Sequence, residues 1–88
     1  MARYEVRVGA SVAKDLRGVP RADVRRILTR MEGLRDDPRP PGSQKLSGDE
    51  RYRVRQGNYR IVYSIMDELL VVEVIKIGHR REVYRHQR

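Results

Sequence analysis

The sequence predicts one α+β domain, residues 1–88, with the element order β-α-α-β-β-β and a helical hairpin packed on one face of a small, mainly antiparallel sheet. Three observations lead to this prediction. A length of 88 residues suits a single domain. Apolar residues recur with helical spacing between positions 24 and 34. The second half of the chain either alternates polar with apolar residues or runs continuously apolar, as strands do.

The N-terminal segment predicts a strand followed by a short helix. Residues 3–8 alternate between apolar and charged side chains, which is typical of a half-buried strand. Ser11 is the predicted N-cap of a helix over 11–17, because its hydroxyl can accept a hydrogen bond from a backbone N–H of the first turn. Gly18 then ends this helix.

A second helix is predicted over 21–35. One apolar stripe runs along it at the spacing of a helix face, formed by Val24, Ile27, Leu28, Met31 and Leu34. Since the chain has no Phe and no Trp, its core must be aliphatic with tyrosine. We expect the helices to cover a core made of Tyr63, Ile65, Val72 and Val74 together with Leu16, Ile27, Leu28 and Met31.

Turn residues divide the second half of the chain. The prolines of 36–43 mark a loop, after which 44–46 can begin a short strand. Gly57-Asn58 is a two-residue hairpin signal with Gly first, as a type II′ turn prefers, and Asp67-Glu68 is a weaker turn. These turns separate the strands of an antiparallel meander, which we expect at 51–56, 59–66 and 69–77.

The predicted hairpin gathers arginines on one face of the sheet. A two-residue loop sets Arg55 directly opposite Arg60, and direct partners share a face, which Arg53 also shares. Guanidinium groups match phosphate oxygens, so we interpret this face as a phosphate-binding surface. The alternative is a solvated face on which arginine serves solubility. If the next turn also has two residues, Glu73 falls opposite Val62 on the same face.

The charge balance favours an anionic partner. The chain has 17 Arg and 3 Lys against 12 acids, a net charge of +8, which suits a nucleic acid, an acidic protein or a lipid surface. The absence of Cys excludes a disulfide scaffold and a thiol nucleophile, and two His exclude a His/Cys metal cluster. No apolar run can span a bilayer and no secretory signal is visible, so we expect a cytoplasmic protein.

The C-terminal residues extend the predicted basic face. The last predicted strand adjoins the second strand of the hairpin, so it delivers His79, Arg80 and Arg81 to one end of the sheet. Tyr84 offers an aromatic surface on which a base can stack, with a core anchor as the alternative; for His79 the alternative is a surface histidine. The candidate phosphate-binding residues are Arg51, Arg53, Arg55, Lys76, Arg81 and Arg85.

Two blocks of sequence, 51–63 and 74–84, resemble the RelE branch of the RelE/ParE toxin superfamily. The first carries Gly-x-Tyr-Arg-x-x-Tyr and the second Gly-His-Arg-x-x-x-Tyr. The resemblance covers essentially the whole chain and implies a RelE-like microbial RNase fold. It also implies the toxin of a type II toxin–antitoxin pair, whose partners are the ribosome with its mRNA and an acidic, RelB-like antitoxin.

The activity that the resemblance implies is endonucleolytic cleavage of mRNA in the ribosomal A site, which inhibits translation. A ribose 2′-hydroxyl attacks its own 3′-phosphate, with no metal and no cofactor. Matched position by position, Arg60, Arg80 and Tyr84 take catalytic roles. Arg53 and Arg55 are further catalytic candidates, but they stand where the prototype toxin has lysines. Arginine effectively cannot give up its proton, so they can bind phosphate and stabilise the transition state but do not suit the role of the base. The base is left open among His79, Tyr84, a ribosomal group and the RNA itself.

Two other functions compete with this one. The first is a toxin of the ParE branch, which acts on DNA gyrase and is not a nuclease; it explains a cluster of arginines without acids less well. The second is a catalytically weakened module that binds RNA or an antitoxin, which the arginines in place of lysines favour. A neighbouring gene for a short acidic protein would establish the toxin–antitoxin setting but not the target. Codon-phased cuts in a translated message would distinguish a nuclease from a gyrase poison, which leaves none.

Overall fold

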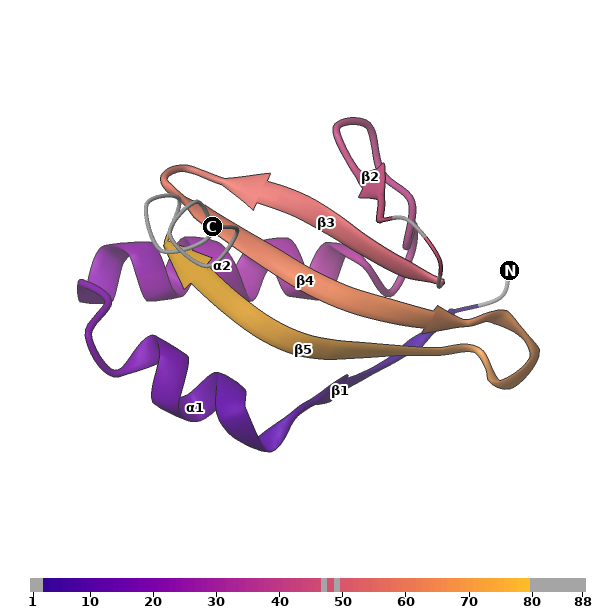
Figure 1. The fold of residues 1–88 in the computed structure, drawn as a ribbon, viewed down its shortest axis with the longest axis horizontal. Helices are drawn as coiled ribbons and strands as arrows, with labels where there is room; N and C mark the ends of the chain where they lie inside the picture. The colour runs from indigo at the N-terminus through magenta and orange to yellow at the C-terminus, as the bar shows by residue number, and fades with distance from the viewer. Residues whose placement is uncertain (1–2, 47, 49, 80–88) are drawn as a thin grey trace.

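The computed structural model describes residues 3–46, 48 and 50–79 of the chain (Figure 1). The elements are β1 (Glu5–Val8), α1 (Ala10–Leu16), α2 (Arg21–Gly33), β2 (Gln44–Lys45), β3 (Arg51–Gln56), β4 (Tyr59–Met66), the 3-10 turn η1 (Asp67–Leu69) and β5 (Val71–His79). This order confirms the predicted β-α-α-β-β-β arrangement, with the short strand that was expected after the proline loop. Of the helices in the described part of the chain, none is long and apolar enough to cross a bilayer.

The strands form one mixed sheet in the order β1-β5-β4-β3-β2. The pairs β2–β3, β3–β4 and β4–β5 are antiparallel, whereas β1 runs parallel to β5. Figure 1 shows α2 lying behind the sheet and α1 beside β1 and β5, so one face of the sheet is covered by helices and the other is open. The nearly continuous apolar run of β5 predicted an interior strand, and β5 indeed lies between β1 and β4.

Helix α1 begins one residue earlier than predicted, and the prediction of Ser11 as its N-cap is wrong. The N-cap is Gly9, and no side chain caps the helix. The Ser11 hydroxyl instead donates a hydrogen bond of 3.0 Å to the carbonyl oxygen of Ile75 on β5. Glycine is favoured at position 9 because the chain passes very close to β5: a Cβ here would lie 3.0 Å from the carbonyl oxygen of Val74.

The core between the helices and the sheet contains most of the predicted residues. Its buried members are Val12, Ile27, Met31, Leu34, Tyr52, Val54, Ile61, Tyr63, Ile65, Val72, Val74 and Ile77. The prediction of Leu28 as a core residue is wrong, because this side chain is 44% exposed. Ile27, Met31 and Leu34 follow one another at helical spacing and face the sheet, which turns Leu28 toward the flank of the helix. Leu16 is only partly buried.

The connection between β4 and β5 is longer than the predicted two-residue turn. The 3-10 turn is followed by Leu70 in the left-handed region, with φ 53°, so Met66 pairs with Val71. A further irregularity lies between Val62 and Tyr63. The predicted pairing of Glu73 with Val62 is therefore wrong: Glu73 lies opposite Ser64, and Lys76 lies opposite Val62.

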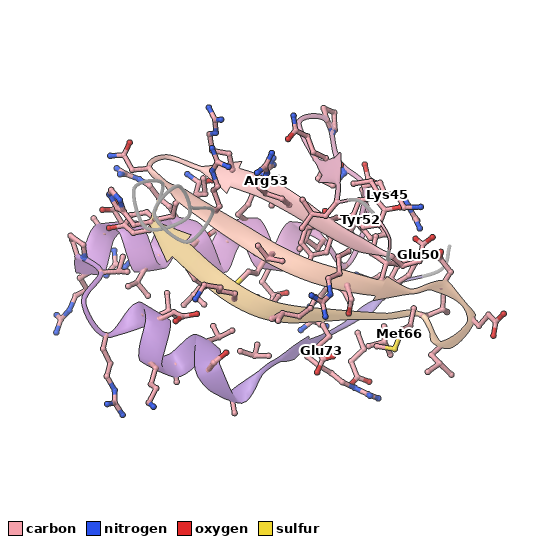
Figure 2. The ribbon with its side chains drawn as sticks, in the orientation of Figure 1. Lys45, Glu50, Tyr52, Arg53, Met66 and Glu73 are labelled. Carbon is pink, nitrogen blue, oxygen red and sulfur yellow. The ribbon has the colours of Figure 1, made fainter. Side chains whose placement is uncertain are left out.

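An ion-pair network built on Arg39 holds this connection in place. The two terminal nitrogens of Arg39 donate to the carboxylate of Asp67 at 3.2 and 2.8 Å, and its Nε donates to the hydroxyl of Tyr52 at 3.0 Å. The hydroxyl of Tyr4 also donates to Asp67, at 2.6 Å. Figure 2 shows Tyr52 beside Glu50 at the start of β3. Because Arg39 belongs to the proline loop, the network ties that loop to the sheet.

The same loop is fixed at a second point by a buried hydroxyl. Tyr63 is fully buried and donates a hydrogen bond of 2.7 Å to the carbonyl oxygen of Pro38. Burial raises the pKa of Tyr63 to about 12, so its hydroxyl remains a donor over the whole physiological range. These contacts bear on the position of β2, because the loop residues that follow them lead directly into that strand.

The network predicts a specific pH dependence of stability. Hydrogen bonds from Arg39 and Tyr4 lower the pKa of Asp67 from 3.8 to about 2. A carboxyl with a depressed pKa in the folded state stabilises the fold above its unfolded pKa and loses that contribution as the pH falls toward its folded pKa. We expect Asp67→Asn to lower the melting temperature at neutral pH, and the difference from the wild type to shrink as the pH falls from about 4 to about 2. Circular dichroism melts at each pH measure this difference in melting temperature. A difference independent of pH would contradict the stabilising role of the Asp67 carboxylate.

Candidate functional site

The β3–β4 hairpin has the register that the sequence predicts. Arg55 pairs with Arg60, and Arg53 pairs with Val62. Gly57, the first residue of the turn, has φ 60°, as a type II′ turn requires, which explains why a residue without a side chain stands there. Since direct partners share a face, the three arginines lie on the open face of the sheet, opposite the helices.

A hollow of about 300 Å³ opens between these arginines and the end of the proline loop. It is lined by Gly42, Gln44, Arg53, Arg55 and Arg60, and we call it the arginine hollow. The short strand β2 pairs with β3 so that Gln44 lies beside Arg53, and the Nη2 of Arg53 donates a hydrogen bond to the side-chain oxygen of Gln44. This contact holds the Arg53 guanidinium at the side of the hollow.

Arg60 and Arg55 occupy different depths. Arg60 is only 4% exposed, and among the described residues it is the one charged residue that is buried. Arg55 is exposed. On the other side of Arg60, β5 contributes Gly78, which places no side chain at that register position. Glycine within a strand often marks a place where another group approaches closely. The hollow therefore has one deep guanidinium and others nearer its mouth.

The lining suits an oxyanion. None of the described residues that line the arginine hollow is acidic, and three of them carry guanidinium groups. Guanidinium groups donate several hydrogen bonds in a fixed plane and form bidentate pairs with phosphate. They can hold a phosphate and stabilise negative charge that develops on it, but they cannot accept a proton at physiological pH. The arrangement thus favours binding and charge stabilisation, and leaves proton transfer to another group.

Other predicted residues lie on the same face but outside the arginine hollow. Lys76 is exposed beside Val62, which separates it from Arg53 in the register. Arg51 lies one row further along, opposite Ser64, and Glu73 follows on β5 in that row (Figure 2). The open face therefore carries basic residues on β3, β4 and β5, with Glu73 and Glu5 as acids at the end distant from the hollow.

The structure does not bring His79 to the arginine hollow. His79 pairs with Tyr59, and their rings meet edge to face with centroids 5.2 Å apart. Both lie on the helix-covered face, beside a different hollow that also includes Lys14 and Asp15 of α1. The carboxylate of Asp15 accepts a hydrogen bond of 3.0 Å from the backbone N–H of Ile77, which fixes α1 against the end of β5. This position does not favour His79 as a base for a phosphate in the arginine hollow.

The remaining predicted residues, Arg80, Arg81, Tyr84 and Arg85, lie outside the described residues. Two residues of the arginine hollow were not singled out by the sequence, namely Gly42 and Gln44. Their only sequence signal is their place between the proline loop and the predicted short strand. That signal gives no pairing partner, and the pairing of Gln44 with Arg53 is what brings it to the site.

Comparisons with known proteins find matches over almost the whole chain. Residues 6–84 match a family model described as the ParE toxin of the type II toxin–antitoxin system parDE. Toxin RelG of Mycobacterium tuberculosis is 29% identical over 86 residues, covering 93% of this chain and 97% of that protein. Among solved structures, an archaeal RelE–RelB complex from Pyrococcus horikoshii OT3 matches with a TM-score of 0.80 at 32% identity, over 91% of this chain and 97% of its counterpart. The isolated Escherichia coli RelE toxin matches with a TM-score of 0.74 at 27% identity, over 96% and 94% of the two chains.

Proposed function

Because the chain belongs to the family of ParE toxins of type II toxin–antitoxin systems and is a RelE-type toxin, we propose that it is an endoribonuclease that cleaves mRNA in the ribosomal A site. The observation that carries the proposal is the arginine hollow, in which the buried Arg60 lies beside Arg55 and Arg53 without an acid among the described lining residues. Such a cleavage takes place in the cytoplasm, where the ribosomes are.

In the proposed reaction, the 2′-oxygen of one ribose attacks the adjacent phosphorus. The bond to the 5′-oxygen of the next nucleotide breaks, and a cyclic phosphate remains on the upstream product. The 2′-hydroxyl gives its proton to a base, and the leaving 5′-oxygen receives one. Arg60 holds the phosphate and stabilises the extra negative charge of the transition state, with help from Arg53 and Arg55.

The group that accepts the proton of the 2′-hydroxyl must lie outside the arginine hollow. Arginine stays protonated, and His79 lies on the other face of the sheet. We therefore assign the base to Tyr84, to a ribosomal group or to the RNA itself, with Arg80 assisting the leaving oxygen. A requirement for a ribosomal group would explain cleavage that depends on the ribosome.

We also propose an acidic, RelB-like antitoxin as the partner. The related structures from Pyrococcus horikoshii and Mycobacterium tuberculosis are toxin–antitoxin complexes. The net charge of +8 and the basic open face are suited to an acidic chain. We expect expression of the toxin alone to stop growth and co-expression of the antitoxin to restore it, as colony counts would show. Normal growth at high expression of the toxin alone would contradict an active toxin.

Primer extension on a translated message tests the nuclease. We expect cuts in phase with the codons of the translated region, and none when initiation on that message is blocked. The description of the matched family favours one second candidate, a ParE-like toxin that acts on DNA gyrase without cutting RNA. That candidate predicts an intact message together with inhibited DNA supercoiling.

A further inference from the structure

A second basic hollow lies on the other side of the β3 end, against helix α2. It has a volume of about 420 Å³. Its polar lining is formed by Arg25, Arg26, Thr29, Arg30 and Gln56. Arg25, Arg26 and Thr29 are exposed on α2, and Gln56 is the last residue of β3. We call this the α2 hollow.

The α2 hollow carries positive charge without a compensating acid, and Gly33, Leu34 and Pro40 complete its lining. Among the described residues that line it none is Asp or Glu, and of its three arginines Arg26 alone forms a described ion pair, with Asp23 at 3.5 Å. The Nε of Arg30 is buried and has no hydrogen-bond partner among the described residues. A buried donor without an acceptor is unusual in a native fold. Beside it, the half-buried Arg30 and the exposed Arg25 and Arg26 bring guanidinium groups to the hollow, and such groups can donate to an oxyanion.

The α2 hollow adjoins the arginine hollow. Gln56 lines the α2 hollow and its neighbour Arg55 lines the arginine hollow, because successive residues of a strand point to opposite faces. In the proline loop, Pro40 lines the α2 hollow and Gly42 lines the arginine hollow. Strand β2 pairs with β3 only at Tyr52 and Arg53, so in the described part of the chain no strand separates the two hollows at the end of β3.

We propose that the α2 hollow binds a backbone phosphate of the same RNA strand whose cleaved phosphate lies in the arginine hollow. The proposal rests on the proposed function, which supplies the RNA. A strand that passes over the end of β3 can place one phosphate among Arg53, Arg55 and Arg60 and a neighbouring one among Arg25 and Arg30. The α2 hollow then positions the message without taking part in the bond changes.

Single substitutions in the α2 hollow test this role. Arg30→Gln removes a half-buried arginine, and Arg25→Gln removes an exposed one without disturbing the core. Arg21→Gln is the matched control, because it removes the same charge from an exposed position on the same helix, outside the hollow. Circular dichroism melts verify the fold of each variant. The substrates are programmed ribosomes and a single-stranded RNA oligonucleotide with a 2′-deoxy sugar at the cleavage position.

We expect Arg30→Gln and Arg25→Gln to raise the KM for cleavage about tenfold with kcat unchanged, and Arg21→Gln to change neither by more than about twofold. Each of the two hollow variants should also lower the slope of log Kd for the oligonucleotide against log salt concentration by about 0.7, which corresponds to one lost contact to a single-strand phosphate.

Three other results would overturn the proposal. Hollow variants that behave like Arg21→Gln in both assays would remove the phosphate site and leave the proposed function intact. Unchanged RNA binding with weakened binding of the antitoxin would assign the α2 hollow to an acidic protein segment. If the wild type cleaves no message at all, the proposed function fails. In that case, salt slopes of the two hollow variants equal to that of the wild type would reject the phosphate site independently.

Discussion

Arg60→Gln is expected to lower the rate of mRNA cleavage on programmed ribosomes by about 10²–10³, since that is the usual cost of losing one donor to a developing oxyanion. Arg60 is the deepest of the arginines on the open face, and its place opposite Arg55 follows from the hairpin register. Glutamine is preferred to alanine as the replacement, because the Arg60 side chain is buried and alanine would leave a cavity.

Two further variants separate charge from geometry. Arg60→Lys keeps the positive charge but loses the planar pair of donors, so we expect its rate to remain well below that of the wild type. Arg17→Gln removes one charge from an exposed position after α1 and should cleave at nearly the wild-type rate. A folded Arg60→Gln protein with full activity would refute the assignment of Arg60 and would favour a binding module.

Ile27→Ala is expected to lower the free energy of unfolding by about 2–5 kcal/mol, the usual cost of deleting a fully buried aliphatic side chain. Ile27 is 0% exposed and lies where α2 packs on the sheet. The neighbouring Leu28→Ala removes a side chain that is 44% exposed, and we expect it to cost less than about 1 kcal/mol.

Urea unfolding followed by circular dichroism measures both values. The pair is well matched, because the two residues are adjacent on one helix and belong to one apolar stripe in the sequence. Equal losses from the two substitutions would mean that α2 is rotated relative to the sheet, with Leu28 facing the core. A domain of this size has limited stability, so loss of the Ile27 side chain could unfold a large fraction of the protein at physiological temperature.

The stripe of α2 also shows what a helical pattern can and cannot predict. Its spacing predicts that a helix forms and that one side of it is apolar. It does not decide which part of a wide stripe faces the sheet, because that depends on how the helix rotates when it packs. The sequence therefore treats Ile27 and Leu28 alike, whereas the packed structure buries one and exposes the other.

The candidate site divides in the same way. The positions of Arg53, Arg55 and Arg60 could be predicted because a two-residue turn and strand alternation act between near neighbours in the chain. Gln44 could not be predicted as a lining residue, because its contact with Arg53 depends on where the proline loop crosses the sheet edge. His79 was expected near the arginines, and only its pairing with Tyr59 shows that it lies on the helix-covered face.

The amino-acid sequence by itself determined the element order, the hairpin register and the arginine face, because turn geometry and side-chain periodicity fix them over a few residues. Tertiary structure alone decided the depth of Arg60, the separation of His79 from the arginines, and the meeting of α2 with the end of β3 in a second basic hollow. These features depend on how distant elements pack against one another. Networks such as Arg39 with Asp67 form only once the chain has folded, so no local pattern records them.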